Sequence, residues 1–552
     1  MVFRRFVSVG VAIGVFLLWA DAGRARTPDD IAVIAFQIDD LMTLDPAEVY
    51  ELSGIEVVAN VYDRLVERDP GNPSAFKGSL AESWSVSPDG RTFAFTLRRG
   101  VRFPSGHELT AVDAAWSLQR VLRLDKGPAF LLKGLGLNRE TAGTAIRSPD
   151  DHTLVIETGR PLAPGFVLDS LATWAASVLD RREVEAHAKG DDLGNGWLRR
   201  TSAGSGAFRV TLWRPNEALI LDRNASASSW RQTPASSWRQ TPASSWRQTP
   251  AMRRVVLRHV PEPATQRLLL EKGDVDIARN IGPDDLPALS AHPAIRVRPV
   301  PQASIYYLGL NQKNPYLARP QVRQALKHLV DYGLIRDTLL KGTKTVHQTV
   351  LPEGIDGALD ERPFAYDPAK ARALLAEAGL ADGFPVTMDA RNTPPTTDIA
   401  QALQAMWAKA GIRLEILPGD NKQTLTRYRA RAHDIYIGRW APDGLDPHSN
   451  AQAFAWNPDN RDGAGDKTLA WRNSWETPDT SRLVERALAE TDPARRRALY
   501  VELQRLCLKS SPFVILFQDA DPVAERTDVT GFTAGPTSDD VSYRGIRKSR
   551  GE

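Results

Sequence analysis

The sequence has almost no cysteine and no excess of one charge sign. Cys507 is the single cysteine among 552 residues, which excludes an intramolecular disulfide and leaves stability to packing. Seventy Lys and Arg residues face 67 Asp and Glu residues, a net charge of +3. This excess is too small to indicate nucleic-acid binding. Cys507 shares a helical spacing with Leu499, Leu503 and Leu506, which predicts a buried thiol and not a lipid anchor.

The local signatures of catalysis and metal binding are missing as well. The nine histidines lie at least 15 residues apart, and no HExxH, GxSxG, P-loop or GxGxxG motif is present. Zinc sites and nucleophile elbows depend on such close spacing. Asp274 and Asp276 follow a glycine in the segment GDVDI, which favours turn and strand-start roles over acid–base work. An enzyme would need a site assembled from distant residues and is the weaker hypothesis.

A long uncharged hydrophobic run occurs at the start of the chain. Arg4 and Arg5 precede the uncharged stretch 6–20, and small residues around Ala22 and Ala25 offer a cleavage site. This pattern predicts a cleavable export signal over residues 1–25. The stretch is shorter than the roughly 20 residues that span a bilayer, so a membrane anchor is the weaker interpretation.

The length predicts several lobes, because 552 residues exceed what one hydrophobic core supports at roughly 100 to 200 residues per domain. Residues 93–97 alternate apolar with smaller or polar side chains after a Pro-Asp-Gly turn, and Val101 and Phe103 continue the period. This predicts a hairpin-like β segment. Thr110 and Asp113 resemble a capping box that opens a helix.

The second half of the chain alternates helices with strands. Apolar residues recur first at helical and then at strand spacing, and capping residues, Pro and Gly mark where the helices begin and end. Predicted helices begin at Pro320, run from the N-cap Asp367 to Gly379, and run from Ile399 to Gly411; predicted strands cover 412–416 and 436–437. This order predicts an α/β lobe whose strands are joined by helical crossovers.

Residues 228–251 are three consecutive copies of SSWRQTPA. The eight-residue period with a proline in each copy fits neither a helix nor a strand, so a loop is expected. We favour a duplication in a tolerant surface loop. The alternative is an Arg/Trp surface for a partner, as in an adhesin or scaffold.

Four stretches of the chain together resemble the family 5 extracellular solute-binding proteins, the dipeptide and oligopeptide receptors of ATP-driven importers. The second stretch is the most specific, and the four follow the order of that family. They are TLDP from Thr43 with NVYDRLVERDP from Asn60; LAESWSVSPDGRTFAFTLRRGVRFPSGHELTAVDAAWSLQRVL from Leu80; GSGAFRVTLWRPNEALILDRN from Gly204; and LGLNQKNPYLARPQVRQAL from Leu308.

The resemblance implies an α/β fold of the periplasmic-binding-protein-like type, a two-lobed clamp of class II, cluster C, with an additional third domain. Relative to that family, two of the three SSWRQTPA copies are an insertion outside the cleft. The implied division is signal peptide 1–25; domain I 26–73, 191–305 and 513–552; domain II 74–190; and domain III 306–512.

The resemblance also implies a function and partners. The protein would capture a peptide or peptide-like ligand between its lobes and deliver it to an inner-membrane ABC permease with its ATPase subunits. It would act as a monomer, without cofactor, catalytic step or nucleic acid, in the periplasm of a Gram-negative bacterium. Alternatives are the same fold for an opine, an oligosaccharide or a chelated metal, and less favoured, a periplasmic hydrolase.

Three residues are candidates for the ligand site. Trp440 and Asp443 follow the predicted strand 436–437, at the end where open α/β sheets bind ligands. In dipeptide receptors a Trp followed three residues later by Asp supplies the carboxylate for the peptide ammonium, which implies that role for Asp443; a turn before Gly444 is the alternative. Arg391 is similar in position to the Arg that pairs with the peptide carboxylate, with a surface role as its alternative. Asp446 is expected to form a turn.

Overall fold

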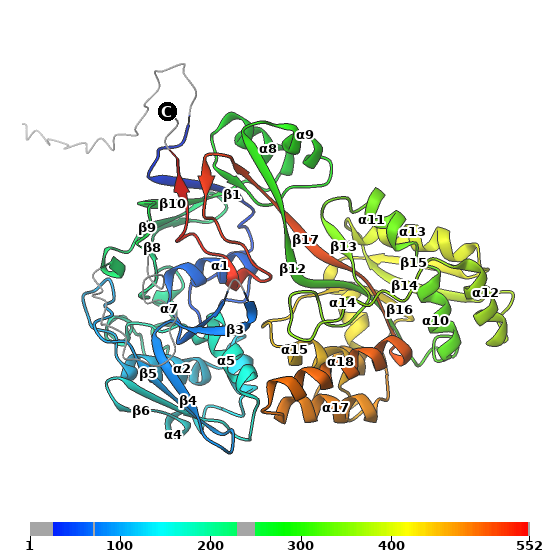
Figure 1. The fold of residues 1–552 in the computed structure, drawn as a ribbon, viewed down its shortest axis with the longest axis horizontal. Helices are drawn as coiled ribbons and strands as arrows, with labels where there is room; N and C mark the ends of the chain where they lie inside the picture. The colour runs from blue at the N-terminus through cyan, green and yellow to red at the C-terminus, as the bar shows by residue number, and fades with distance from the viewer. Residues whose placement is uncertain (1–25, 70–71, 229–248, 550–552) are drawn as a thin grey trace, which may run out of the picture.

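The structure is a computed structural model that describes residues 26–69, 72–228 and 249–549. The predicted export signal and most of the SSWRQTPA copies lie outside these residues. The chain forms two lobes that lie side by side (Figure 1). The left lobe of that view holds the first half of the chain and the C-terminal segment, and the right lobe holds most of the second half.

One mixed, eleven-stranded sheet runs through both lobes. Its order is β15 (Arg413–Gly419), β14 (Pro385–Arg391), β16 (Ile435–Trp440), β12 (Ile295–Leu310), β17 (Phe513–Arg526), β11 (Ile277–Ala278), β1 (Ile31–Phe36), β10 (Arg254–His259), β9 (Ala218–Arg223) and β8 (Phe208–Arg214), with β13 (Lys344–Val346) paired to β17. Strands β14, β15 and β16 are parallel to one another, as the predicted crossovers require.

The long antiparallel pair β12 and β17 connects the lobes (Figure 1). Their ladder is continuous from Ile295 to Pro301, shifts register, and resumes from Ile305 to Gly309. Val300 packs into the left lobe, whereas Ile305 packs into the right one. The irregularity therefore lies where the strands pass from one lobe to the other. It also directly precedes the predicted domain boundary between residues 305 and 306, and the domain boundaries stay a prediction.

The right lobe buries both faces of its part of the sheet. Alternate side chains of β12 point to opposite faces, so Leu308 and Leu310 join one core while Ile305 and Tyr307 join the other. The first core is covered by α10 (Pro320–His328), α12 (Pro368–Glu377) and α13 (Thr396–Ala408); the second by α14 (Asn421–Arg429), α15 (Pro447–Ala455), α17 (Pro478–Ala489) and α18 (Pro493–Ser510).

In the described residues the left lobe has two large cores and a smaller one under α8 (Pro263–Lys272) and α9 (Leu286–Ala291). One large core lies against the large sheet under α1 (Leu52–Val61). The other joins α2 (Ala111–Leu124) and α5 (Pro164–Ala172) to a separate sheet. That sheet has the order β4 (Ala81–Val86), β5 (Thr92–Leu97), β7 (Thr153–Glu157) and β6 (Ile146–Asp150), and the hairpin β2 (Val66–Asp69) with β3 (Asn72–Gly78) lies beside it.

The structure confirms most local predictions and corrects one. Thr110 and Asp113 form the predicted capping box, and the Asp367 side chain accepts a hydrogen bond from the Lys370 amide at the start of α12. Cys507 is buried in α18. The prediction of a β segment over residues 101–103 is wrong beyond a single bridge at Arg102, because the segment turns back at once to meet Glu108. Among the described residues no helix is long and apolar enough to cross a membrane.

A buried ion pair ties α2 to the segment before α1. Asp45 is 0% exposed and Arg120 is 1% exposed, and the guanidinium donates to both carboxylate oxygens at 2.8 and 2.6 Å. Asn195 donates a further hydrogen bond of 2.7 Å to the same carboxylate. Because the pair is complete and fully buried, removing one partner leaves an uncompensated charge.

Arg120→Met is therefore expected to lower the free energy of unfolding by about 3–5 kcal/mol, because Asp45 would stay buried without its cation. The measurement is denaturant unfolding followed by circular dichroism. Arg123→Met removes the same charge from an exposed position of the same helix and is the control, expected within about 0.5 kcal/mol of the wild type. Equal stability of the two variants would contradict the assignment.

Candidate ligand site between the lobes

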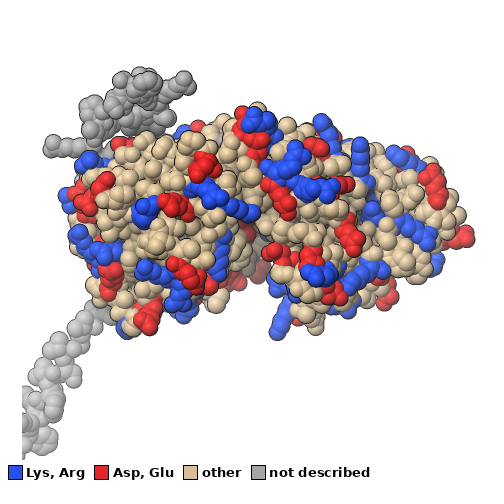
Figure 2. Space-filling model, turned by 90° about the horizontal axis from the view of Figure 1, so that it is seen from below, with Lys and Arg blue, Asp and Glu red and all other residues tan. Residues whose placement is uncertain are grey.

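A cavity of about 360 Å³ lies between the lobes. The left lobe contributes α1, β2, the end of α5 and the loop 533–545, and the right lobe contributes residues 443–445. Figure 2 shows the two lobes from below, with a notch between them and both charge signs interspersed over this face. The cavity is of the size that holds a small molecule, and its walls come from elements of both lobes.

Asp443 is the predicted site residue that the structure places in the cavity wall. It follows β16, and the hydroxyl of Tyr50 from the left lobe donates a hydrogen bond of 2.8 Å to its Oδ1. Burial raises the pKa of Asp443, and the Tyr50 hydrogen bond acts against that rise. Among the described residues no cation pairs with this carboxylate, so its negative charge is open to a ligand. Its ligand role stays a prediction.

Trp440 and Arg391 do not line this cavity. Trp440 is half-buried at the end of β16, where its Nε1 donates to Asn450 Oδ1 at 3.2 Å and its ring meets Phe454 edge-on. These contacts fix the start of the loop that carries Asp443. Arg391 ends β14 and is exposed. The structure therefore brings one of the three candidates into the cavity, and contacts of the other two with a ligand stay predictions.

Further ionisable residues line the cavity, and the sequence analysis did not single them out. Arg64, Glu67 and Arg68 belong to the stretch NVYDRLVERDP, and Asp539 comes from the C-terminal segment. Arg64 pairs with Asp539 at 2.6 Å, and burial raises the pKa of Asp539 to about 6. Apart from the family resemblance, no local sequence pattern marks these residues as part of a site, because the contact of Arg64 with Asp539 joins the two ends of the chain.

A seam of polar contacts closes the lobes beside the cavity. The Asp446 amide donates to Asp169 Oδ2 at 3.1 Å, and Asp169 also pairs with Arg68. Gly444 makes this approach possible, because a Cβ there would lie 2.2 Å from Asp169 Oδ2. Asp446 is more than the expected turn residue: it caps α15 and accepts two hydrogen bonds of 2.7 Å from Arg496.

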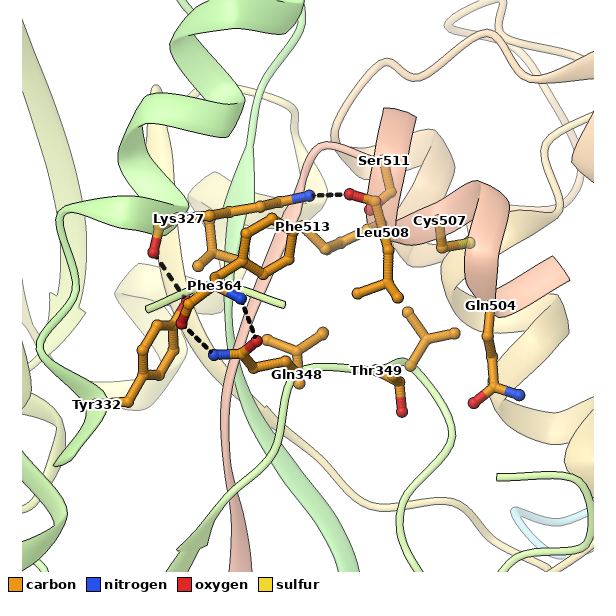
Figure 3. Close-up of a pocket in the computed structure, with 13 residues that line it drawn as sticks. Lys327, Tyr332, Gln348, Thr349, Phe364, Gln504, Cys507, Leu508, Ser511 and Phe513 are labelled. Carbon is orange, nitrogen blue, oxygen red and sulfur yellow. Dashed lines mark hydrogen bonds between the residues drawn. The ribbon is translucent and has the colours of Figure 1, made fainter. Parts of the chain in front are cut away.

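A second cavity lies inside the right lobe, lined by Lys327, Gln348 and Cys507 among others (Figure 3). Lys327 Nζ donates to the Leu508 carbonyl at 2.9 Å, and burial lowers the pKa of Lys327 to about 7. Its volume of about 10 Å³ suits a single water molecule. This cavity is therefore too small for a solute. Nor, within the described ranges, do three or more His, Cys, Asp or Glu side chains gather as metal ligands.

His448 lies at the seam and is buried, with its ring edge-on to Phe166 of the left lobe at 5.2 Å. Burial lowers its pKa to about 4; Asp446 acts against that shift, while Arg496 and Arg160 add to it. The folded state thus holds a neutral ring that the unfolded chain protonates below about pH 6.5. Stability from this group is present above that pH and is lost as the pH falls toward 4.

Between pH 7 and pH 4 the free energy of unfolding is expected to fall less for His448→Asn than for the wild type, with a difference of up to about 3 kcal/mol. Denaturant unfolding at a series of pH values measures the difference. His187→Asn at an exposed position is the control and should follow the wild type. Parallel pH profiles of the wild type and His448→Asn would contradict the assignment.

Comparison with known proteins agrees with this architecture. The model of the "Bacterial extracellular solute-binding proteins, family 5 Middle" matches residues 75–461. The curated Escherichia coli protein named "Probable D,D-dipeptide-binding periplasmic protein DdpA" is 28% identical over 94% of each chain.

Two solved structures share the fold. The periplasmic binding protein DppA from Helicobacter pylori, in complex with the peptide STSA, has a TM-score of 0.73 at 24% identity and covers 94% of this chain and 98% of its own. AgaA from A. tumefaciens, in complex with agropinic acid, has a TM-score of 0.68 at 21% identity, over 95% and 100% of the two chains. The chain therefore belongs to the bacterial extracellular solute-binding proteins of family 5.

Proposed function

We propose that this chain is the periplasmic receptor of an ABC importer, which encloses a peptide or peptide-like ligand between its lobes and delivers it to an inner-membrane permease with ATPase subunits. The observation that carries the proposal is the cavity between the lobes, with the carboxylate of Asp443 in its wall and no cation paired to it among the described residues. The names of the relative and of the DppA structure, a dipeptide-binding protein and a peptide complex, support a peptide ligand.

The mechanism uses the difference between an open and a closed arrangement of the lobes. The right lobe is joined to the left through β12 and β17, whose ladder is irregular between Pro301 and Ile305. Rotation there separates the walls of the cavity, and contacts such as Asp446 to Asp169 and Ala163 to Leu488 exist only when the lobes meet. A ligand that contacts both lobes shifts the population toward the closed form.

Asp443 would bind the α-ammonium group of the ligand. The Tyr50 hydroxyl holds one carboxylate oxygen from the opposite lobe and leaves the other oxygen for the ligand. This hydrogen bond forms only when the lobes are closed, because Tyr50 and Asp443 belong to different lobes. Trp440 would position this loop through Asn450 and Phe454.

The proposal includes export by residues 1–25, a monomeric receptor and no chemical step. Export is supported by the uncharged run that follows Arg4 and Arg5. The absence of a chemical step is supported by the family match, because that family consists of solute-binding proteins. The direct experiment is native mass spectrometry of the mature protein from its own host, with release and identification of the bound molecule. One peptide per chain is the expected result; a protein that is empty and whose melting temperature no di- to pentapeptide shifts would overturn the peptide assignment.

Asp443→Asn is expected to weaken binding of peptides with a free α-ammonium by about 30-fold to several thousand-fold, as for the loss of one partner of an enclosed charge pair worth about 2–5 kcal/mol. Isothermal titration calorimetry measures the change. Asp466→Asn, at an exposed position of the same lobe, is the control. An N-acetylated peptide should bind the wild type and Asp443→Asn alike, and an equal loss for both peptides would speak against ammonium recognition.

A further inference from the structure

The wall of the cavity between the lobes is acidic. Among the described residues that line it there are more carboxylates than guanidinium groups, and no lysine or histidine. The carboxylates are Glu67, Asp69, Asp443, Asp539 and Asp540, and the guanidinium groups are Arg64, Arg68 and Arg544. Simple counting gives five negative against three positive charges. A closed cavity with this balance favours a ligand that brings positive charge.

Each guanidinium group of the wall is already paired with a carboxylate. Arg64 pairs with Asp539 at 2.6 Å, Arg68 pairs with Asp169, and Arg544 lies 3.6 Å from Asp63. Arg64 also donates to the Ala172 carbonyl at 2.6 Å. These cations neutralise side chains of the protein itself. A ligand carboxylate would have to compete with them, at the cost of leaving a buried carboxylate unpaired.

Glu67 stands in contrast to these pairs. It lies in β2, opposite Lys77 of β3 in the backbone register, but the Lys77 ammonium pairs with Asp69 at 2.7 Å instead. Burial raises the pKa of Glu67, and the more distant charges of Arg544 and Arg64 act against the rise. Across the described part of the chain, Glu67 forms no ion pair. A carboxylate held partly out of water without a cation is a place where a bound cation is stabilised strongly.

Among the described residues three carboxylates of the wall form no ion pair, and two of them, Glu67 and Asp443, face the cavity from opposite lobes. The third, Asp540, accepts a hydrogen bond of 2.7 Å from the Thr537 hydroxyl. Glu67 comes from β2 of the left lobe, and Asp443 comes from the loop after β16 of the right lobe. A ligand with two cationic groups would therefore reach both lobes through charge-assisted contacts, which is what stabilises a closed form.

We propose that the ligand of this receptor is a cationic peptide, with its α-ammonium group on Asp443 and a basic side chain on Glu67. The inference rests on the proposed function and adds the class of peptide to it. It also separates this receptor from one for acidic solutes, since Arg391, the cation expected to bind a carboxylate, is exposed and lies outside the cavity wall.

The test compares three dipeptides whose second residue differs in charge: alanyl-lysine, alanyl-alanine and alanyl-glutamate. Each is used in the L,L and the D,D form. A matching set of tripeptides carries one additional alanine. Calorimetry on the full mature chain is expected to show the lysine peptide binding at least about tenfold more tightly than the alanine peptide, the difference expected for one charged hydrogen bond. The glutamate peptide should bind most weakly.

The variant Glu67→Gln tests whether Glu67 causes the preference for the lysine peptide. It is expected to reduce the advantage of the lysine peptide to less than about threefold and to leave the alanine peptide within about twofold of its wild-type affinity. Glu82→Gln, an exposed position on β4, changes the net charge equally and should keep the full preference. A loss of preference in both variants, or in neither, would overturn the role of Glu67.

The series with the wild type needs no variant and separates the two proposals. Binding of all three peptides with equal affinity, or a preference for glutamate, would overturn the cationic-ligand inference and leave the receptor function standing. Binding of none of the peptides would overturn the inference, and the proposed peptide receptor would then be decided by the native mass spectrometry and the melts with di- to pentapeptides.

Discussion

The antiparallel pairing of β12 with β17 is the interaction on which the rest of the structure depends. Their backbone hydrogen bonds run from Ile295 to Gly309 and continue one sheet through both lobes. The ladder fixes the distance and the direction between the two cores, while its interruption between Pro301 and Ile305 gives the chain a place to bend. The relative position of the two walls of the cavity follows from this pair of strands.

The two lobes meet through charges as well as through packing, and this choice has a physical consequence. Buried ion pairs add little net stability against apolar replacements, but they are strongly directional. Asp446 with Arg496 and Asp45 with Arg120 are completely paired, so they hold elements in place. Glu67, in β2 of the left lobe, forms no ion pair among the described residues. Paired charges thus hold elements in place within each lobe, and an unpaired carboxylate is left for the proposed recognition of a ligand.

Elements that depend on neighbours in the sequence could be predicted. The cap at Thr110, the cap at Asp367 and the helix that buries Cys507 rest on spacings of a few residues. The family resemblance supplied Asp443. The resemblance implied a ligand space between the lobes, but most residues that line the cavity could not be predicted, because its walls depend on contacts such as Tyr50 with Asp443, 393 positions apart. For the same reason Glu67 gave no signal: an exposed-strand glutamate and a cavity carboxylate look identical in sequence.

Gly444 shows how small a change would separate the lobes. The contact between its loop and Asp169 leaves no room for even one methyl group, since a Cβ would fall 2.2 Å from the carboxylate oxygen. An alanine there would act as a wedge that disfavours the closed state without touching a ligand. Every ligand would then spend part of its binding energy on overcoming the wedge, and apparent affinities would fall by a common factor. In the proposed receptor, the missing Cβ of Gly444 thus favours the closed arrangement of the lobes for every ligand alike.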